Sequence, residues 1–198
     1  MTYDYHVVLG ILAACIGVVS LAPYIRDMFK ATTKPHPLTW FVWALINIIA
    51  FFAQVAAGGG PGAWVSGVVA LECFAVALLS LSRGEKRITV LDWWCFAGAL
   101  AGVIFWQLTN SPLVAVIFVT LTDALASVPT FRKSYLRPHE ETVSSYLLGT
   151  LRSLLALPAL QVFNVTTVLY LAFIAVSDAL LVVMVLLRRR QLGRVSKI

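Results

Sequence analysis

Six polar side chains lie deep inside apolar stretches of the chain, where they could bind a solute or a proton. Four of them ionise, and such a side chain near the centre of a bilayer costs about 2.5–3.5 kcal/mol on insertion scales, so it tends to face a protein interior or water. The six are Glu72, Asp123, Arg152, Asp178, Asn47 and Ser153. All except Asp123 are candidate solute-binding residues, and the three acids are candidate proton-coupling residues.

Glu72 and Asp178 are expected to face each other across one site. Each lies near the middle of its own apolar stretch. Two carboxylates within a few ångströms of each other cannot both ionise at low cost. The pair could therefore bind a cation, or a proton that leaves when a solute enters. The alternative is that the two acids are protonated or paired contacts between helices.

Arg152 needs a partner inside the membrane because its guanidinium does not deprotonate. Asp123 is the expected partner, since both residues belong to the second half of the chain and lie at comparable depth. Two roles stay open. Arg152 clamps Asp123, or it points into the pocket and holds a substrate carboxylate bidentately; with Glu72 and Asp178, the second role would suit a zwitterion.

Catalytic machinery is not visible in the sequence. It contains no Gly-rich phosphate loop, no HExxH and no Ser or Cys nucleophile with an intramembrane His. No Lys lies inside an apolar stretch, so a retinal Schiff base has no attachment point. We therefore expect a protein that is not an enzyme, with no cofactor and no metal site.

The composition indicates an all-α membrane protein. The 198 residues are 60% hydrophobic and 12% charged, with a mean hydropathy of +0.89, whereas soluble domains carry roughly 25% charged residues. A spanning helix needs about 20 apolar residues. Seven such stretches are present, at about 5–24, 38–57, 61–82, 90–108, 111–131, 142–160 and 166–187.

The net charge of +6 is better explained by membrane topology than by nucleic acid. Fourteen of the 15 Lys and Arg residues fall on one side if the chain crosses seven times. By the positive-inside rule, that side is cytosolic. The amino terminus is then outside and the carboxyl terminus cytosolic, in an integral protein of the plasma (inner) membrane.

An ungapped shift of 106 residues brings the first three stretches onto the last three. The shift aligns Pro23 with Pro129, Asn47 with Ser153, and Glu72 with Asp178. Because the extra fourth helix restores the orientation, the repeat is parallel, in a 3+1+3 arrangement. The expected units are a first triple-helix bundle at 1–84, a linker helix at 85–110, a second bundle at 111–188 and a basic cytosolic tail at 189–198.

This arrangement, with a proline at the cytosolic end of the first helix of each repeat, resembles the SWEET and PQ-loop superfamily. The proline segments read Ala22-Pro23-Tyr24 and Val128-Pro129-Thr130, with Tyr24 and Thr130 in place of the glutamine of that family. Pro23 and Pro129 either end their helices or act as hinges for alternating access. The second role rests partly on the resemblance.

Residues near the ends of the stretches have simpler interpretations. Trp40, Trp43 and Tyr146 are expected in an interfacial aromatic belt. His36 and His139 occupy loops and are expected to be solvated.

The sequence favours a SWEET-like transporter that moves a small polar solute (a sugar, amino acid or cation) by alternating access, with proton linkage left open. The alternative is a PQ-loop-type membrane receptor that binds a ligand without transporting it. A scaffold or a membrane enzyme without a recognisable motif is a third hypothesis. The expected partners are the solute and the lipid bilayer, without nucleic acid, and a homo-oligomer is left open.

Overall fold

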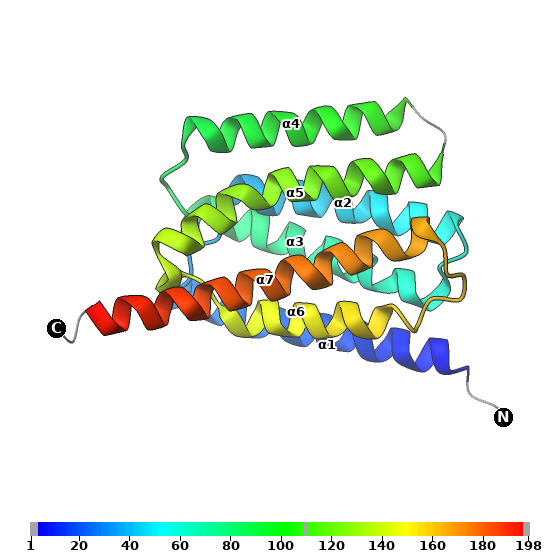
Figure 1. Cartoon of the computed structure of the whole chain (residues 1–198), viewed down its shortest axis with the longest axis horizontal. Coiled ribbons are helices and arrows are strands. Elements are labelled where there is room, and N and C mark those ends of the chain that lie inside the picture. Colours follow the sequence, from blue (N-terminus) through cyan, green and yellow to red (C-terminus); the bar gives the residue numbers. More distant parts are fainter. Residues whose placement is uncertain (1–3, 109–110, 196–198) are drawn as a thin grey trace.

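Seven α-helices run side by side along one long axis in the computed structural model, which describes residues 4–108 and 111–195 (Figure 1). The short 3-10 helices η1 (Gly60–Ala63) and η2 (Pro138–Glu140) precede α3 and α6. The α-helices are α1 (Tyr5–Phe29), α2 (Pro37–Ala56), α3 (Trp64–Arg83), α4 (Val90–Gln107), α5 (Pro112–Leu136), α6 (Val143–Ala156) and α7 (Val165–Val195).

Local sequence signals explain several helix ends. The Asp4 carboxylate accepts a hydrogen bond from the His6 backbone N–H, 3.0 Å away, and so caps α1. Pro37 and Pro112 are the first residues of α2 and α5, where the missing N–H of proline has no helical partner to lose. Helix α6 ends at Ala156, two residues before Pro158, because proline has no backbone N–H with which to continue the helical hydrogen bonds.

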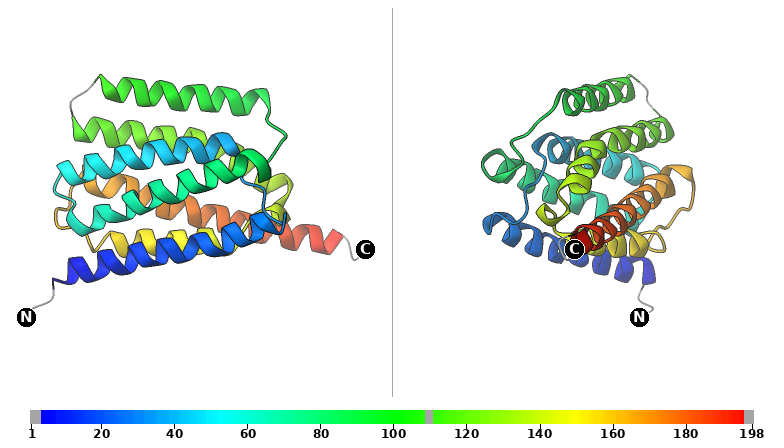
Figure 2. Two further views of the ribbon diagram at one scale, coloured as in Figure 1. Left: turned by 180° about the vertical axis from the view of Figure 1, so that it is seen from behind. Right: turned by 60° about the vertical axis from the view of Figure 1, so that its left-hand side comes forward.

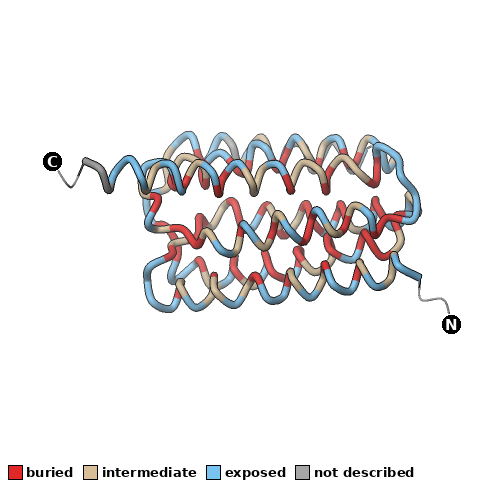
Figure 3. Tube along the Cα trace, turned by 60° about the horizontal axis from the view of Figure 1, so that its bottom comes forward, coloured by how far each residue is buried: buried red, intermediate tan, exposed pale blue. Residues whose placement is uncertain are grey.

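The expected all-α membrane architecture is confirmed: among the described residues, five helices, against seven expected spans, are long and apolar enough to cross a bilayer. They are α1, α2, α3 extended by η1, α5 and α7. Helix α6 has only 14 residues, a rise of roughly 21 Å, which is shorter than the stretch expected at 142–160. Outward-facing positions carry large apolar side chains such as Leu71, which is 74% exposed, as contact with lipid would require, while buried positions face the space between helices (Figure 3).

Six of the helices pack as two triplets, one formed by α1, α2 and α3 and the other by α5, α6 and α7. Helix α3 packs against both α1 and α2, and α7 packs against both α5 and α6. The triplets meet through α1 against α6 and through α2 against α5. Helix α4 lies outside this group, against α5 and less extensively against α2 (Figures 1 and 2).

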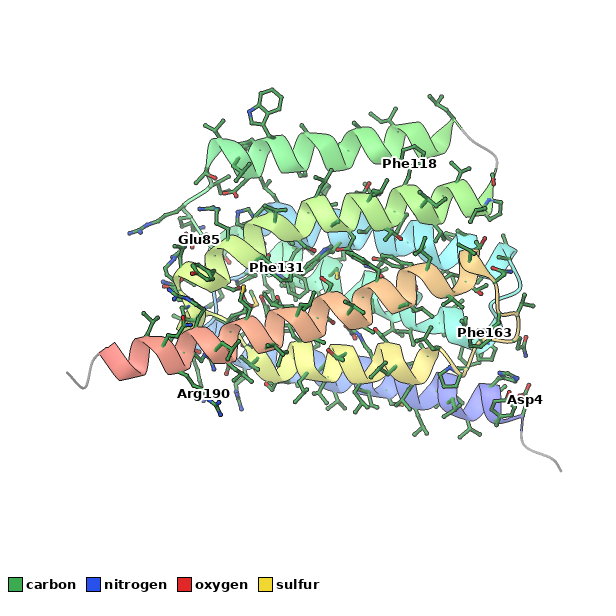
Figure 4. The ribbon with its side chains drawn as sticks, viewed as in Figure 1. Asp4, Glu85, Phe118, Phe131, Phe163 and Arg190 are labelled. Carbon is green, nitrogen blue, oxygen red and sulfur yellow. The ribbon has the colours of Figure 1, made fainter. Side chains whose placement is uncertain are left out.

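The connecting segments divide between the two ends of the molecule. The α1–α2, α3–α4 and α5–α6 connections lie at the same end as the carboxyl terminus of α7, and we call this the basic end (Figure 1). Glu85 and Arg190 mark it, whereas Asp4 and Phe163 lie at the opposite end (Figure 4). The sequence boundary expected at 188/189 falls inside α7, and residues 196–198 of the expected tail lie outside the described residues.

Candidate functional site: a polar cavity between the helix triplets

A cavity of about 70 Å³ lies near the middle of the helices, lined by residues of α1, α2, α3, α5, α6 and α7. At roughly 10–15 Å³ of such volume per water, it has room for about five water molecules. Five of the six polar residues singled out in the sequence line it: Asn47, Glu72, Asp123, Arg152 and Asp178. Ser153 is also buried, but it is not part of this lining.

Arg152 pairs with Glu72, not with Asp123 as expected. The Arg152 Nη1 donates to Glu72 Oε2 at 2.5 Å, and the two side chains are only 10% and 9% exposed. Helix α1 makes room for the pair at Gly17, where a Cβ would come within 2.9 Å of Glu72 Oε1. The guanidinium therefore acts on the acid of α3 from the opposite triplet.

Asp123 is held by neutral donors instead. Its carboxylate accepts hydrogen bonds from Trp43 Nε1 at 2.7 Å, from Tyr170 Oη at 3.0 Å and from Ser127 Oγ at 3.0 Å. The physical reason is helix placement, because α5 packs on α2 and α7, whereas Arg152 belongs to α6, which packs on α1 and α7. Asp123 and Arg152 share the cavity without sharing a bond.

Asp178 is the acid with spare binding capacity. Its side chain lines the cavity and is partly exposed to it, and it makes no hydrogen bond or ion pair with any residue in the described ranges. Gly149 lies directly beside it, since a Cβ at that glycine would overlap the Asp178 carboxylate. An unpaired carboxylate in such a cavity can take up a proton or a cationic group.

Several polar atoms around the cavity also lack a hydrogen-bond partner among the residues that the structure describes. They include Arg152 Nε, Glu72 Oε1, Asn47 Oδ1 and Trp40 Nε1. Asn47 uses its other polar atom, Nδ2, to donate to the Trp43 carbonyl at 2.9 Å. Buried polar atoms are normally hydrogen-bonded, so these donors and acceptors are suited to a bound solute or water.

Aromatic side chains separate the cavity from the basic end, a position that sequence reasoning did not predict for them. Tyr24, Trp40 and Tyr146 line the cavity and are at most 9% exposed, so the expected interfacial belt is wrong for Trp40 and Tyr146. The Tyr24 ring lies 4.9 Å from that of Trp40 and 6.2 Å from that of Tyr146, measured between centroids. Trp43, also expected in the belt, instead lines the cavity and donates to Asp123.

Glu141 binds the hydroxyl groups of the two tyrosines in this group, Tyr24 and Tyr146. Its carboxylate accepts from Tyr24 Oη at 2.9 Å and from Tyr146 Oη at 3.4 Å, and it forms a buried ion pair with Lys133. The Lys133 ammonium also donates to the Lys34 carbonyl at 2.7 Å. This network ties the α1–α2 connection to the α5–α6 connection. Spacing along the sequence gave no signal for it, because both charged residues lie in the connection between the stretches expected at 111–131 and 142–160.

Pro23 and Pro129 do not end their helices. Helix α1 continues to Phe29 and α5 to Leu136. Proline inside a membrane helix is tolerated where neighbouring groups satisfy the freed backbone. The hinge role therefore stays a prediction, whereas helix termination at these prolines is wrong.

Within the residues that the structure describes, no group of three or more His, Cys, Asp or Glu side chains could hold a metal ion. The arrangement is that of a small polar binding cavity. No family model, curated protein or solved structure matches this chain.

Proposed function

We propose that the protein is a membrane transporter that moves a small polar solute by alternating access, with the central cavity as its binding site. The observation that carries the proposal is the cavity itself: three acids and one arginine surround it, within helices whose outer faces are apolar. Ionisable groups inside a membrane are costly and tend to mark solute or ion pathways. The proposed orientation places the basic end in the cytosol and the amino terminus outside, in a plasma (inner) membrane.

An internal two-fold relation supports this proposal. The Thr39 hydroxyl of α2 donates to the Ala126 carbonyl of α5 at 2.8 Å, and the Ser145 hydroxyl of α6 donates to the Ser20 carbonyl of α1 at 2.6 Å. Thr39 and Ser145 are 106 positions apart, as are Ser20 and Ala126. A rotation that exchanges the triplets therefore exchanges the two bonds.

Residues at equivalent positions also meet each other, as they must near such an axis. Lys34 Nζ donates to Glu140 Oε1 at 3.1 Å across a separation of 106 residues. Glu72 and Asp178 have the same separation and line the same cavity. Transporters built from parallel repeats bind their substrates near the midplane, where the repeats meet, which is also the architecture of the proposed SWEET and PQ-loop kinship.

The two equivalent acids have different partners, and this difference suggests their roles. Glu72 is neutralised by Arg152, whereas Asp178 has no hydrogen-bond or ion-pair partner among the residues that the structure describes. We assign Asp178 to the proton or the cationic part of the solute. Glu72 Oε1 and Arg152 Nε, which lack a hydrogen-bond partner among the described residues, offer an acceptor and a donor to the polar remainder of a sugar, amino acid or similar molecule.

Alternating access also needs a barrier that opens toward the basic end. The Tyr24 and Tyr146 hydroxyls and Lys133 all contact Glu141, so opening this end must separate them. The hinge prolines lie in the helices that carry Tyr24 and Lys133.

The test is flux into liposomes that contain the purified protein. Radiolabelled glucose, alanine and lysine are the probes, each measured with and without an inward proton gradient. We expect one of them to enter, with Asp178→Asn lowering its flux and changing its dependence on the gradient. Asp4→Asn, which alters an acid at the opposite end, is the matched control. Normal flux and unchanged pH dependence in Asp178→Asn would refute the assigned role, and saturable binding without flux would indicate a receptor.

A further inference from the structure

A second cavity, separate from the central one, opens at the basic end of the molecule. Its volume is about 540 Å³, and it lies between the α1–α2 connection, the end of α3 with the α3–α4 connection, and the segment that follows α5. Five basic and two acidic side chains line it, which leaves three unbalanced positive charges. The seven are Lys34, Arg83, Lys86, Arg87, Arg137, Glu85 and Glu140.

The two acids are already occupied by two of the basic residues. Arg137 pairs with Glu85 and, at 2.9 Å, with Glu140. Lys34 pairs with Glu140 at 3.1 Å. The unbalanced charge therefore belongs to the remaining three side chains, which all come from the segment 83–87.

Among the described residues, most N–H donors of Arg83, Lys86 and Arg87 have no hydrogen-bond acceptor. The Arg83 guanidinium lies 4.4 Å from the centroid of the Phe29 ring, a stacking contact that uses its face and leaves its N–H edges available. Lys86 Nζ donates to the Leu81 carbonyl at 2.8 Å and has two further protons. The Arg87 guanidinium makes no hydrogen bond or ion pair with any residue in the described part of the chain.

We infer that this cavity binds a phosphate group, held by the guanidinium edges of Arg83 and Arg87 and by the Lys86 ammonium. Guanidinium groups bind phosphate oxygens bidentately, and three unbalanced positive charges favour a dianion or a diester. The phosphate comes from an anionic lipid headgroup or from a soluble phosphorylated molecule. The cavity adjoins the ends of α1 and α3 at Phe29 and Arg83, the level at which basic pockets between membrane helices bind headgroups. The inference stands independently of transport.

The test compares thermal unfolding of the wild type with two double variants. Arg83→Gln/Arg87→Gln removes two cavity charges, and Arg188→Gln/Arg190→Gln removes two charges from α7 outside the cavity lining. Each protein is placed in phosphatidylcholine nanodiscs and titrated with glycerol 3-phosphate at constant ionic strength. A second arm replaces part of the phosphatidylcholine with phosphatidylglycerol. Arg83→Lys/Arg87→Lys keeps the charge but removes the guanidinium geometry.

We expect one arm to raise the unfolding midpoint of the wild type and of the α7 variant. The Arg83→Gln/Arg87→Gln variant should lose that rise, or need at least about tenfold more ligand, and the lysine variant should fall between them. A rise with glycerol 3-phosphate identifies a soluble source, and a rise with phosphatidylglycerol alone identifies a lipid. No rise in either arm, or an equal loss in the α7 variant, would overturn the inference.

Discussion

Replacing Arg152 by alanine tests the central ion pair most sharply. The change removes the partner that lies 2.5 Å from Glu72 in a pair whose side chains are 10% and 9% exposed. Removing one member of a buried pair costs about 3–5 kcal/mol, because the other charge stays desolvated. At about 2–4 °C per kcal/mol for a chain of this size, the unfolding midpoint of the detergent-solubilised protein should fall by at least about 6 °C.

Two double variants identify the acid that pairs with Arg152. Glu72→Ala combined with Arg152→Ala should restore part of the lost stability, because the stranded acid is then gone. Asp123→Ala combined with Arg152→Ala should restore none, since Asp123 is held by Trp43 and Tyr170. Unfolding monitored by tryptophan fluorescence would measure all four proteins. Recovery with Asp123→Ala but not with Glu72→Ala would refute the assignment of the pair.

Three further changes probe other parts of the site. Gly149→Ala pushes a Cβ into the Asp178 carboxylate and should lower solute flux at least about tenfold, because an ångström of misplacement is costly; unchanged flux would mean that the position of Asp178 does not matter. Tyr24→Phe removes the hydroxyl that donates to Glu141 and should cost about 1.5–3 kcal/mol of unfolding free energy, which chemical denaturation would measure; an unaltered midpoint would argue against a closing role. Burial lowers the pKa of His36 below its ordinary value, although Asp92 nearby opposes the shift. The unfolded chain therefore takes up this proton first, so stability should be full above about pH 6.5 and fall below it. His36→Asn should weaken this acid sensitivity in pH-dependent melting curves, and an identical profile would show that the burial of His36 has no such effect.

Sequence reasoning predicted which polar residues share the interior because an ionisable group in the middle of a span is costly against lipid and therefore tends to face the protein interior. Glu72, Asp123, Arg152 and Asp178 all line the central cavity. It could not predict which of them pair, because pairing depends on the rotation of each helix and on its neighbours. Arg152 is 80 positions from Glu72 but forms its ion pair there.

The basic end shows the same limit. Trp40 and Tyr146 lie near helix ends, where an interfacial position is the usual expectation, yet the convergence of the two triplets buries both. His36 was expected to be solvated, and Lys133 lies beyond the end of the stretch expected at 111–131, yet their exposed fractions are only 1% and 2%. Their burial follows from the packing of the α1–α2 connection against the α5–α6 connection, and local sequence carries no signal for a contact between segments about 100 positions apart.

Access to the central cavity from the two sides of the membrane is the most direct test of the account. Asn47→Cys places a thiol in the cavity lining, in a background where Cys15, Cys73 and Cys95 are replaced. A charged, membrane-impermeant thiol reagent is then added to either side of sealed vesicles that hold the protein in one orientation. The account predicts labelling from both sides, slowed by the transported solute. Labelling from one side only, or from neither, would contradict it.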